Sequence, residues 1–335
     1  MENYIPKANS NKEILSIELN KLNILTSINE NNEYKEDGIK IKKLKDNSLT
    51  NFICEINRNK IKYIGSLNKN FEKEGYGFLT YENGEKYLGI FKENLRDNHG
   101  YYEYNPEISK DKKNIIYQFY FGIWKKNIKN EKGVYLWLNE NINAIPFNNF
   151  DNANFDVFIG LFELDNLKYG TYLSKKQNDY YVYHGFFDKN GKKFGDNVFF
   201  YNSTEDQLIY GKVIKDKFIN GYICLYNEDG ILSSILYCEF DNNGSIISYK
   251  NNIDKNKYEN VINDMQMFRN IIMQEDYFTD TFNIFKEMKY FCDNNIKFDS
   301  FYDDSLDLID MTFKFNNAKI FNEIEKNLDL FNRKN

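Results

Sequence analysis

Residues that could carry out catalysis or bind a metal ion are few in this chain and widely spaced. There are two histidines, His99 and His184, and four cysteines, Cys54, Cys224, Cys238 and Cys292. Structural zinc sites use cysteine and histidine ligands in closely spaced pairs, and no such pair occurs. We therefore expect no metal site and interpret the cysteines as small buried thiols.

An acidic run near the C-terminus offers the remaining candidate chemistry. Asp303, Asp304, Asp307 and Asp310 could pair as catalytic carboxylates or bind calcium. Their spacing is not that of an EF-hand loop, which also needs a central glycine. The sequence favours the alternative, in which these acids stand at the N-terminus of a helix near Ser305 and complement its dipole.

The familiar signatures of nucleotide binding and hydrolysis are absent from the sequence. The Gly-x-Gly at Gly75–Gly77 begins a predicted strand and is not followed by a helix, so it is not a phosphate-binding loop. Gly-x-Ser-x-Gly, His-Glu-x-x-His and kinase signatures do not occur. The sequence predicts a protein with no catalytic residues and no cofactor.

A strand–turn–strand pattern organises the middle of the chain. Tyr87-Leu88-Gly89-Ile90-Phe91 follows Glu74-Gly75-Tyr76-Gly77-Phe78, with Asn83-Gly84 between them. Asn-Gly flanked by alternating aromatic and polar residues is the strongest short-range signal for a β-hairpin. This stretch therefore predicts two antiparallel strands.

The pattern recurs, and each copy contributes two glycines. The first glycines are Gly65, Gly89, Gly122, Gly160, Gly185 and Gly211, and the second are Gly77, Gly100, Gly133, Gly170, Gly195 and Gly221. The spacing within a pair is 10 to 12 residues by subtraction of these numbers, whereas the step between copies varies from 24 to 38. The long steps come from insertions at 105–117 and 139–155, where surface loops can grow at little cost.

The repeated glycines suggest how the hairpins pack. Aligned in neighbouring strands, they would let an aromatic ring lie over bare backbone, an approach that a Cβ would block. The aromatic content of 17%, with 29 Phe and 27 Tyr, is consistent with this packing. We expect the glycines to line up along one ladder.

On these residues the chain resembles the MORN repeat family. The resemblance is carried by Tyr87–Phe91 and by Glu74–Phe78, and it extends over residues 58–245. A possible seventh copy, Leu236–Phe240, has Cys238 in place of glycine. The resemblance implies a mainly β protein, an elongated single-layer antiparallel sheet of stacked hairpins, followed by a C-terminal α-helical segment.

We expect three regions. Residues 1–35 form a polar arm or short helix, 36–245 the array of six to seven repeats, and 250–335 a helical region. Apolar residues at steps of three and four predict helices over 258–272 and 279–291, and two more over 305–313 and 320–331.

The charge and hydropathy of the chain argue against some classes of binding partner and cellular location. The net charge of −6 and the pI of about 5.3 argue against nucleic acid as a partner. There is neither an apolar run long enough for a membrane span nor a typical signal peptide at the N-terminus, so a cytoplasmic location is expected. The sequence does not indicate an oligomeric state.

The resemblance implies a scaffold protein of a cytoskeletal assembly, such as a ciliary axoneme or the cell cortex. Its partners would be other proteins of that assembly, bound along an exposed aromatic groove. The predicted partner-binding residues are Tyr87, Phe91, Tyr120, Trp124, Phe158 and Phe162. The alternative is a peripheral module that binds anionic phospholipid through the basic cluster Lys40–Lys45.

Overall fold

The structure of the chain is a computed structural model. It describes residues 27–28, 33–36, 38–43, 52–58, 60–144, 146–147, 153–177, 179–227, 230–250, 259–273 and 276–294.

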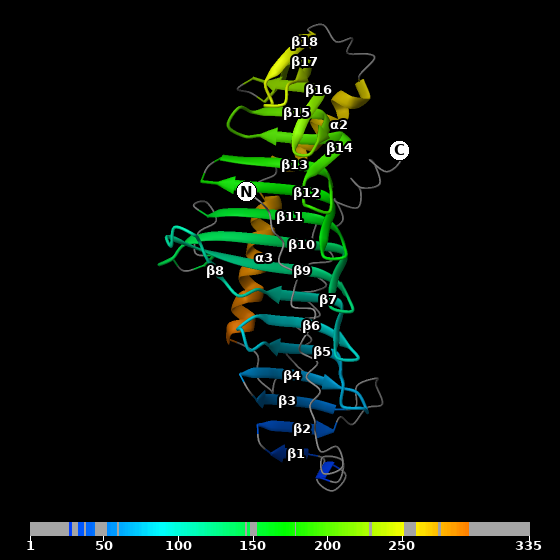
Figure 1. The fold of residues 1–335 in the computed structure, drawn as a ribbon, viewed down its shortest axis with the longest axis vertical. Coiled ribbons are helices and arrows are strands. Elements are labelled where there is room, and N and C mark those ends of the chain that lie inside the picture. Colours follow the sequence, from blue (N-terminus) through cyan, green and yellow to red (C-terminus); the bar gives the residue numbers. More distant parts are fainter. Residues whose placement is uncertain are drawn as a thin grey trace. The chain divides into compact units, whose positions relative to one another are not determined.

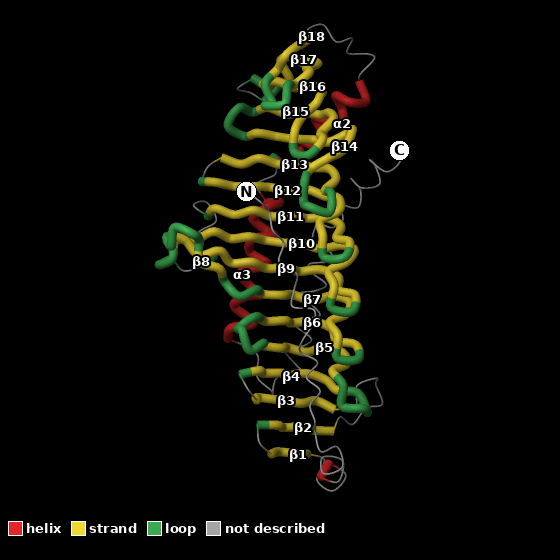
Figure 2. Tube along the Cα trace, viewed as in Figure 1, coloured by secondary structure: helices red, strands yellow, loops and turns green. Residues whose placement is uncertain are grey.

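The described residues form a single open antiparallel sheet of 18 strands, with two α-helices near the C-terminus (Figures 1 and 2). The predicted fold class, mainly β with a helical C-terminal segment, is confirmed. The strands are β1 Glu33–Glu36, β2 Ile39–Lys43, β3 Phe52–Arg58, β4 Ile61–Leu67, β5 Lys73–Thr80, β6 Lys86–Lys92, β7 Leu95–Glu103, β8 Glu107–Ile108, β9 Asn114–Lys125, β10 Ile128–Asn141, β11 Asn154–Glu163, β12 Asn166–Lys176, β13 Asp179–Phe187, β14 Lys193–Asn202, β15 Gln207–Ile214, β16 Lys217–Tyr226, β17 Leu232–Phe240 and β18 Ile246–Lys250.

The helices are α2, Glu259–Ile272, and α3, Asp276–Asn294. Both coincide with stretches in which the apolar periodicity predicts a helix. The helices expected over 305–313 and 320–331, the acidic run and most of the N-terminal arm lie outside the described residues. Neither of the two helices combines the length and the hydropathy required to cross a membrane.

The chain divides into two compact units. The N-terminal unit comprises Pro6–Glu107, Tyr117–Gly133 and Ile284–Asn335, and the C-terminal unit comprises Met1–Ile5, Ile108–Ile116 and Val134–Asn283. The described strands begin at Glu33 and end at Lys250, a few residues beyond each limit expected for the array.

Tight turns join the two strands of several hairpins. Each has two consecutive residues in the left-handed region, with φ of 50° and 70° at Glu93–Asn94 and at Lys126–Asn127. Leu164–Asp165 has the same geometry, with φ of 50° and 68°. Two positive φ values define the type I′ turn, whose twist matches that of the flanking strands. Asn and Asp tolerate this region better than most residues, which accounts for their place in these turns.

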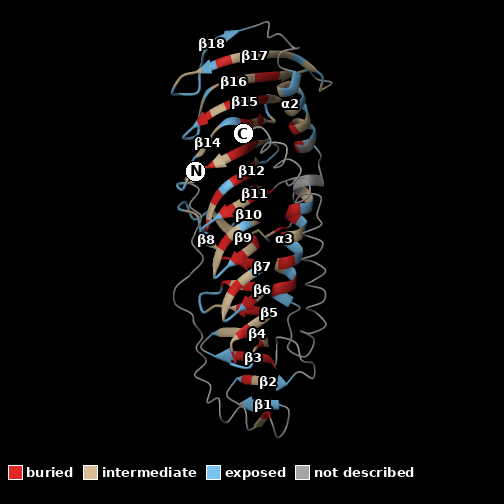
Figure 3. Ribbon diagram, turned by 90° about the vertical axis from the view of Figure 1, so that its right-hand side faces the viewer, coloured by how far each residue is buried: buried red, intermediate tan, exposed pale blue. Residues whose placement is uncertain are grey.

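Each strand has two faces because successive side chains point in opposite directions. We call the side that carries the repeat glycines the glycine face, and the opposite side the helix face because α2 and α3 lie on it. Buried residues lie at the centres of the strands and alternate with exposed residues along α3 (Figure 3).

Candidate interaction surfaces

The repeat glycines form a column within each unit. In the N-terminal unit each pairs with the next in the order Gly65, Gly77, Gly89, Gly100, Gly122. In the C-terminal unit the opposed pairs are Gly160–Gly170, Gly170–Gly185 and Gly211–Gly221. The expected alignment is therefore present within each unit, apart from Gly195.

Gly195 is not a column residue, contrary to the prediction. It pairs with Val213 and has a φ of 142°, and the register shifts between it and Val198. Val198 stands opposite Gly211 instead. Between these two pairs, β14 has one residue more than β15, an irregularity that the spacing of ten residues from Gly185 could not reveal.

Buried cysteines stand in line with the glycines in the outer hairpins. Cys54 pairs with Gly65 in the N-terminal unit, and Cys238 pairs with Gly221 in the C-terminal unit. Both are fully buried. Burial raises the pKa of each thiol, which disfavours the reactive thiolate. These cysteines are therefore packing residues of the column.

Aromatic rings cover the glycines. A methyl group at Gly100 would lie 2.4 Å from Cε2 and from the hydroxyl oxygen of Tyr87, and one at Gly77 would lie 2.7 Å from Cε2 of Tyr63. Tyr87 is fixed because its hydroxyl donates a hydrogen bond of 2.9 Å to the carbonyl oxygen of Ile90. The same bond to the carbonyl three residues further on recurs at Tyr63, Tyr120 and Tyr183.

Edge-to-face contacts link the rings of neighbouring hairpins. Tyr63, Phe91, Tyr87, Trp124 and Tyr120 follow one another with centroids 5.0 to 5.7 Å apart and planes at 84 to 90°. This is the arrangement that the ring quadrupoles favour, and each pair contributes about 0.5–1.5 kcal/mol beyond its buried area. The rings hold the hairpins of the unit together.

The six predicted partner-binding aromatics are therefore not exposed, and that prediction needs correction. Tyr87, Phe91, Tyr120, Trp124, Phe158 and Phe162 are each at most 2% exposed. They cover glycines and one another, so a partner could not contact them without disrupting the column. The sequence indicated the position of the rings on the glycine face but not how completely the array buries them.

Buried cations lie over these rings. Arg96 is 1% exposed, and its guanidinium carbon is 4.4 Å from the Trp124 ring centroid and 4.8 Å from that of Tyr102. Lys73 and Lys129 occupy the corresponding positions, four residues before the second glycine of their hairpins, and both are buried. Cation–π attraction strengthens when the pair is desolvated, so these cations belong to the packed core.

A side-chain clamp joins the tight turn of one hairpin to the hairpin before it. The Oδ1 atom of Asn127 accepts a hydrogen bond of 2.8 Å from the Arg96 backbone N–H, and the Asn127 N–H donates one of 2.9 Å to the Arg96 carbonyl. Asn94 makes the same pair of bonds with Lys73, and Asp216 makes it with Lys193. The repeat glycines alone do not predict this clamp, although its signal is present in the sequence as an Asn or Asp five residues after the first glycine.

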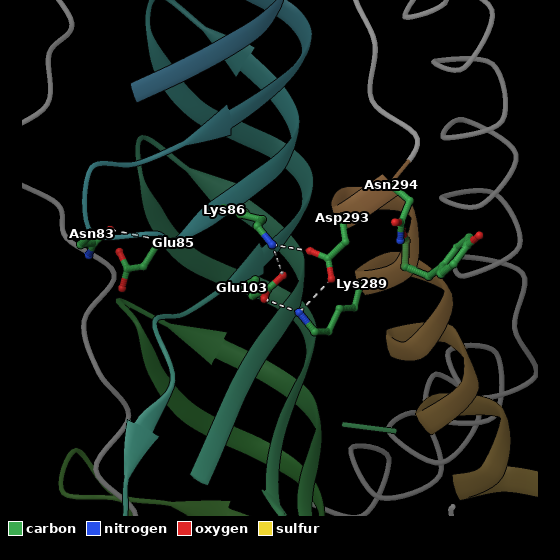
Figure 4. A network of polar contacts seen from close by, with 8 residues as sticks. Asn83, Glu85, Lys86, Glu103, Lys289, Asp293 and Asn294 are labelled. Carbon is green, nitrogen blue, oxygen red and sulfur yellow. Dashed lines mark hydrogen bonds and ion pairs between the residues drawn. The ribbon is translucent and has the colours of Figure 1, made fainter. Parts of the chain in front are cut away.

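On the helix face of the N-terminal unit, residues 284–294 of α3 pack against strands β7 and β9. The ring of Phe285 lies 6.3 Å from that of Tyr101 and 5.9 Å from that of Phe119. Beside these rings, Lys289 contacts Glu103 at 2.7 Å, and Asp293 pairs with Lys86 (Figure 4).

Two further ion pairs close this network into a ring. Lys86 lies 3.4 Å from Glu103, and Lys289 lies 3.2 Å from Asp293. Charges alternate around the four residues, and the Glu103 side chain is only 7% exposed. A buried carboxylate is costly unless it is paired, so the helix supplies a cation that this face of the sheet needs.

On the helix face of the C-terminal unit, α2 packs in a similar way. Phe268 stacks on Phe199 at 4.9 Å, and the Met265 sulfur lies 3.6 Å from that of Cys224. Arg269 binds both carboxylate oxygens of Asp206, at distances of 2.8 and 3.0 Å. Both units thus bind a helix by aromatic contacts and ion pairs together.

The buried His184 is a structural residue. Its ring nitrogens lie 2.9 Å from the Tyr169 hydroxyl and 2.9 Å from the Thr171 hydroxyl. Burial lowers the pKa of His184 to about 4, so the ring is neutral at physiological pH. Among the described residues no group of three His, Cys, Asp or Glu side chains is placed to hold a metal ion.

The basic cluster proposed for lipid binding is only partly described. Lys42 and Lys43 are exposed on β2, whereas Lys40 is partly covered. Acidic residues lie alongside, because Lys42 pairs with Glu33 and Lys40 with Glu55 in the strand registers. These carboxylates weaken the local positive potential.

A hollow of about 480 Å³ lies beside the turns of β6–β7 and β9–β10 in the N-terminal unit. Its lining includes three lysines (Lys92, Lys125 and Lys126) and three acids (Glu93, Asp97 and Glu131). Because the charges are balanced, the hollow has no marked preference for an anion or a cation.

The fold and these surfaces define a repeat protein built from stacked β-hairpins. The model of the MORN repeat matches residues 72–86, 87–106 and 120–141. No curated protein matches the chain. The chain thus contains three detected MORN repeats, which are modules typical of scaffolds or membrane-binding proteins and are generally not enzymatic.

Proposed function

We propose that this chain is a non-enzymatic MORN-repeat scaffold in the cytoplasm and a structural component of a cytoskeletal assembly, either axonemal or cortical. The observation that carries the proposal is the column of glycines and rings, which recurs in both units. The repeat glycines and aromatic rings of the hairpins thus serve to stack one hairpin on the next. A protein built in this way offers partners a rigid support. Because the six aromatics are buried, we assign partner binding to the surfaces around the column.

Affinity purification from a native extract tests this role. Tagged wild-type chain should recover cytoskeletal proteins after brief chemical cross-linking. Gly100→Ala, which disturbs the column, serves as the matched variant and should recover fewer of them. Recovery of the same proteins with both chains, or of no cytoskeletal protein with the wild type, would contradict the proposal.

The second candidate function is binding to anionic phospholipid, which the exposed Lys42 and Lys43 favour. Each basic residue near an anionic surface contributes only about 1 kcal/mol, so two lysines give weak, salt-sensitive binding. Co-sedimentation with phosphatidylserine vesicles should therefore be weak and should fall in Lys42→Gln/Lys43→Gln. Lys125→Gln/Lys126→Gln is the control, since it removes two exposed lysines elsewhere in the unit. Strong wild-type binding that only the first variant loses would make lipid the principal ligand.

A further inference from the structure

The helix face of the N-terminal unit has the chemistry of a helix-binding surface. Tyr101 and Phe119 provide two fully buried rings, and Lys86 stands opposite Glu103 in the register of β6 and β7. Glu103 is too buried to remain unpaired at low cost, and it receives its second cation, Lys289, from the helix. The surface therefore selects an apolar stripe with a cation beside it.

The segment seated there shows which pattern fits. Phe285, Met288 and Cys292 are buried at positions i, i+3 and i+7. Lys289 at i+4 and Asp293 at i+8 meet the charges of the sheet. These five positions lie on one side of an α-helix, so the recognised element is an amphipathic helix with one cation and one acid.

The seated segment is a poor helix by itself. α3 contains neither alanine nor leucine and is rich in aromatic and β-branched residues, which have lower helix propensity. Asp293 lies in its last turn, where a negative charge opposes the helix dipole, and no basic residue lies in that turn. Most of the stability of a helix in a protein comes from packing of its apolar face rather than from intrinsic propensity, so α3 depends on the sheet for its helical state.

We propose that the surface formed by Lys86, Tyr101, Glu103 and Phe119 is a docking site for an amphipathic helix of a partner protein. Residues 284–294 of α3 occupy the site within the chain, and the partner helix displaces them. The inference rests on the proposed scaffold function and specifies its partner by chemistry: apolar residues at i, i+3 and i+7, a cation at i+4 and an acid at i+8. For the partner helix to displace α3, the two ion pairs between helix and sheet, Lys289 with Glu103 and Asp293 with Lys86, must first break.

Ionic strength is a better control of these ion pairs than pH. Burial alone would raise the pKa of Asp293, but Lys86 and Lys289 lower it below its usual range. Burial alone would lower the pKa of Lys289, but Glu103 and Asp293 raise it. Both shifts favour the charged form, so both groups stay charged near neutral pH, whereas salt screens their partly exposed pairs directly.

The test uses the full chain and a fluorescent peptide of residues 279–294. In Lys289→Gln/Asp293→Asn the resident helix loses its ion pairs while the sheet residues are unchanged. An intramolecular occupant lowers the apparent affinity by the fraction of sites it leaves free, so the peptide should bind this variant at least about tenfold more tightly than wild type. Lys286→Gln/Glu287→Gln, on the exposed side of α3, should bind like wild type.

A charge exchange tests whether this surface is the receptor. The peptide with Lys289→Asp and Asp293→Lys should bind the chain carrying Lys86→Glu and Glu103→Lys better than the unmodified peptide does. Equal peptide affinity for the wild type and Lys289→Gln/Asp293→Asn would overturn the proposal. So would unfolding of the unit in that variant, seen by circular dichroism, because α3 would then be an integral part of the core.

Two further measurements are needed. One shows whether the occupant is a partner protein or a second copy of this chain, and the other tests the docking site independently of the proposed scaffold function. If Lys289→Gln/Asp293→Asn forms a dimer in analytical ultracentrifugation and the peptide dissociates that dimer, the occupant is a second copy of this chain and the partner-protein proposal fails. If the peptide binds as expected but affinity purification from a native extract with Lys289→Gln/Asp293→Asn recovers no cytoskeletal protein, the docking site is supported and the proposed scaffold function is contradicted.

Discussion

Replacing Gly100 by alanine tests the packing of glycine against ring most directly. The added methyl group would lie 2.4 Å from Cε2 and from the hydroxyl oxygen of Tyr87, far closer than van der Waals contact allows. The ring cannot move away freely, because its hydroxyl is bonded to the Ile90 carbonyl and its edges meet Phe91 and Trp124. We therefore expect strain in the centre of the N-terminal unit.

The expected loss in free energy of unfolding can be estimated from the overpacking and from the hydrogen bond that Tyr87 would lose. Overpacking a well-packed core costs about 1–3 kcal/mol, and leaving the buried Tyr87 hydroxyl without its acceptor costs about 1–3 kcal/mol. These costs overlap, because moving the ring relieves the clash. We expect the free energy of unfolding of the unit to fall by about 3 kcal/mol. Gly84→Ala is the control: its methyl group would meet no atom within 4 Å, at a φ of 89°, so it carries only the backbone cost of about 1 kcal/mol.

Urea unfolding of the Trp137→Phe background provides the assay, because Trp124 is then the only tryptophan and reports on the N-terminal unit. Tyr87→Leu should partly rescue Gly100→Ala, so the double variant should be more stable than the sum of the two single effects predicts. The reasoning is refuted if Gly100→Ala costs no more than Gly84→Ala, or if the two substitutions are additive.

Three further predictions concern other contacts. Because the folded-state pKa of His184 is about 4, against 6.5 for a free histidine, the unfolded chain binds the proton more readily. The C-terminal unit should thus lose about 3 kcal/mol as pH falls from 6.5 to 4; urea midpoints at both pH values check this, and His184→Gln should flatten the dependence. Asn127→Ala should cost about 2 kcal/mol, whereas Asn127→Asp keeps the acceptor for Arg96 and should stay near wild type in thermal unfolding. Asp206→Asn should weaken the pairing with Arg269 and speed hydrogen exchange in α2 at least about fivefold, with an unchanged rate contradicting the contact.

The hairpins, the glycine columns and the first two C-terminal helices could be predicted from the sequence because each depends on local spacing. Gly65 to Gly122 align because the distance within each hairpin is nearly constant. Gly195 departs from its column because a local irregularity changes the register without changing the motif. A repeat pattern identifies equivalent residues but does not show where one strand has gained residues against its neighbour.

The burial of the six aromatics could not be predicted in the same way. Tyr87 and Trp124 would be half open on a flat single sheet, yet they are buried among rings of neighbouring hairpins and beneath Arg96. That enclosure depends on tertiary contacts such as the one between Arg96 and Asn127, 31 residues apart. The ion pairs of Lys86 and Glu103 with α3 are equally remote in sequence, and no local pattern pairs them.

In the hairpins that carry a turn clamp, sequence changes are constrained at the clamped end and less constrained at the other end. Asn94 and Asn127 tie one end to the preceding hairpin, and the insertion between β7 and β9, which carries β8, lies at the other end. A gene duplication that adds a whole hairpin would also add the Asn side chain that accepts the hydrogen bond. The preceding hairpin would supply the backbone N–H that donates it. Lineages could thus change the number of hairpins, or elaborate the free end, without redesigning the joints.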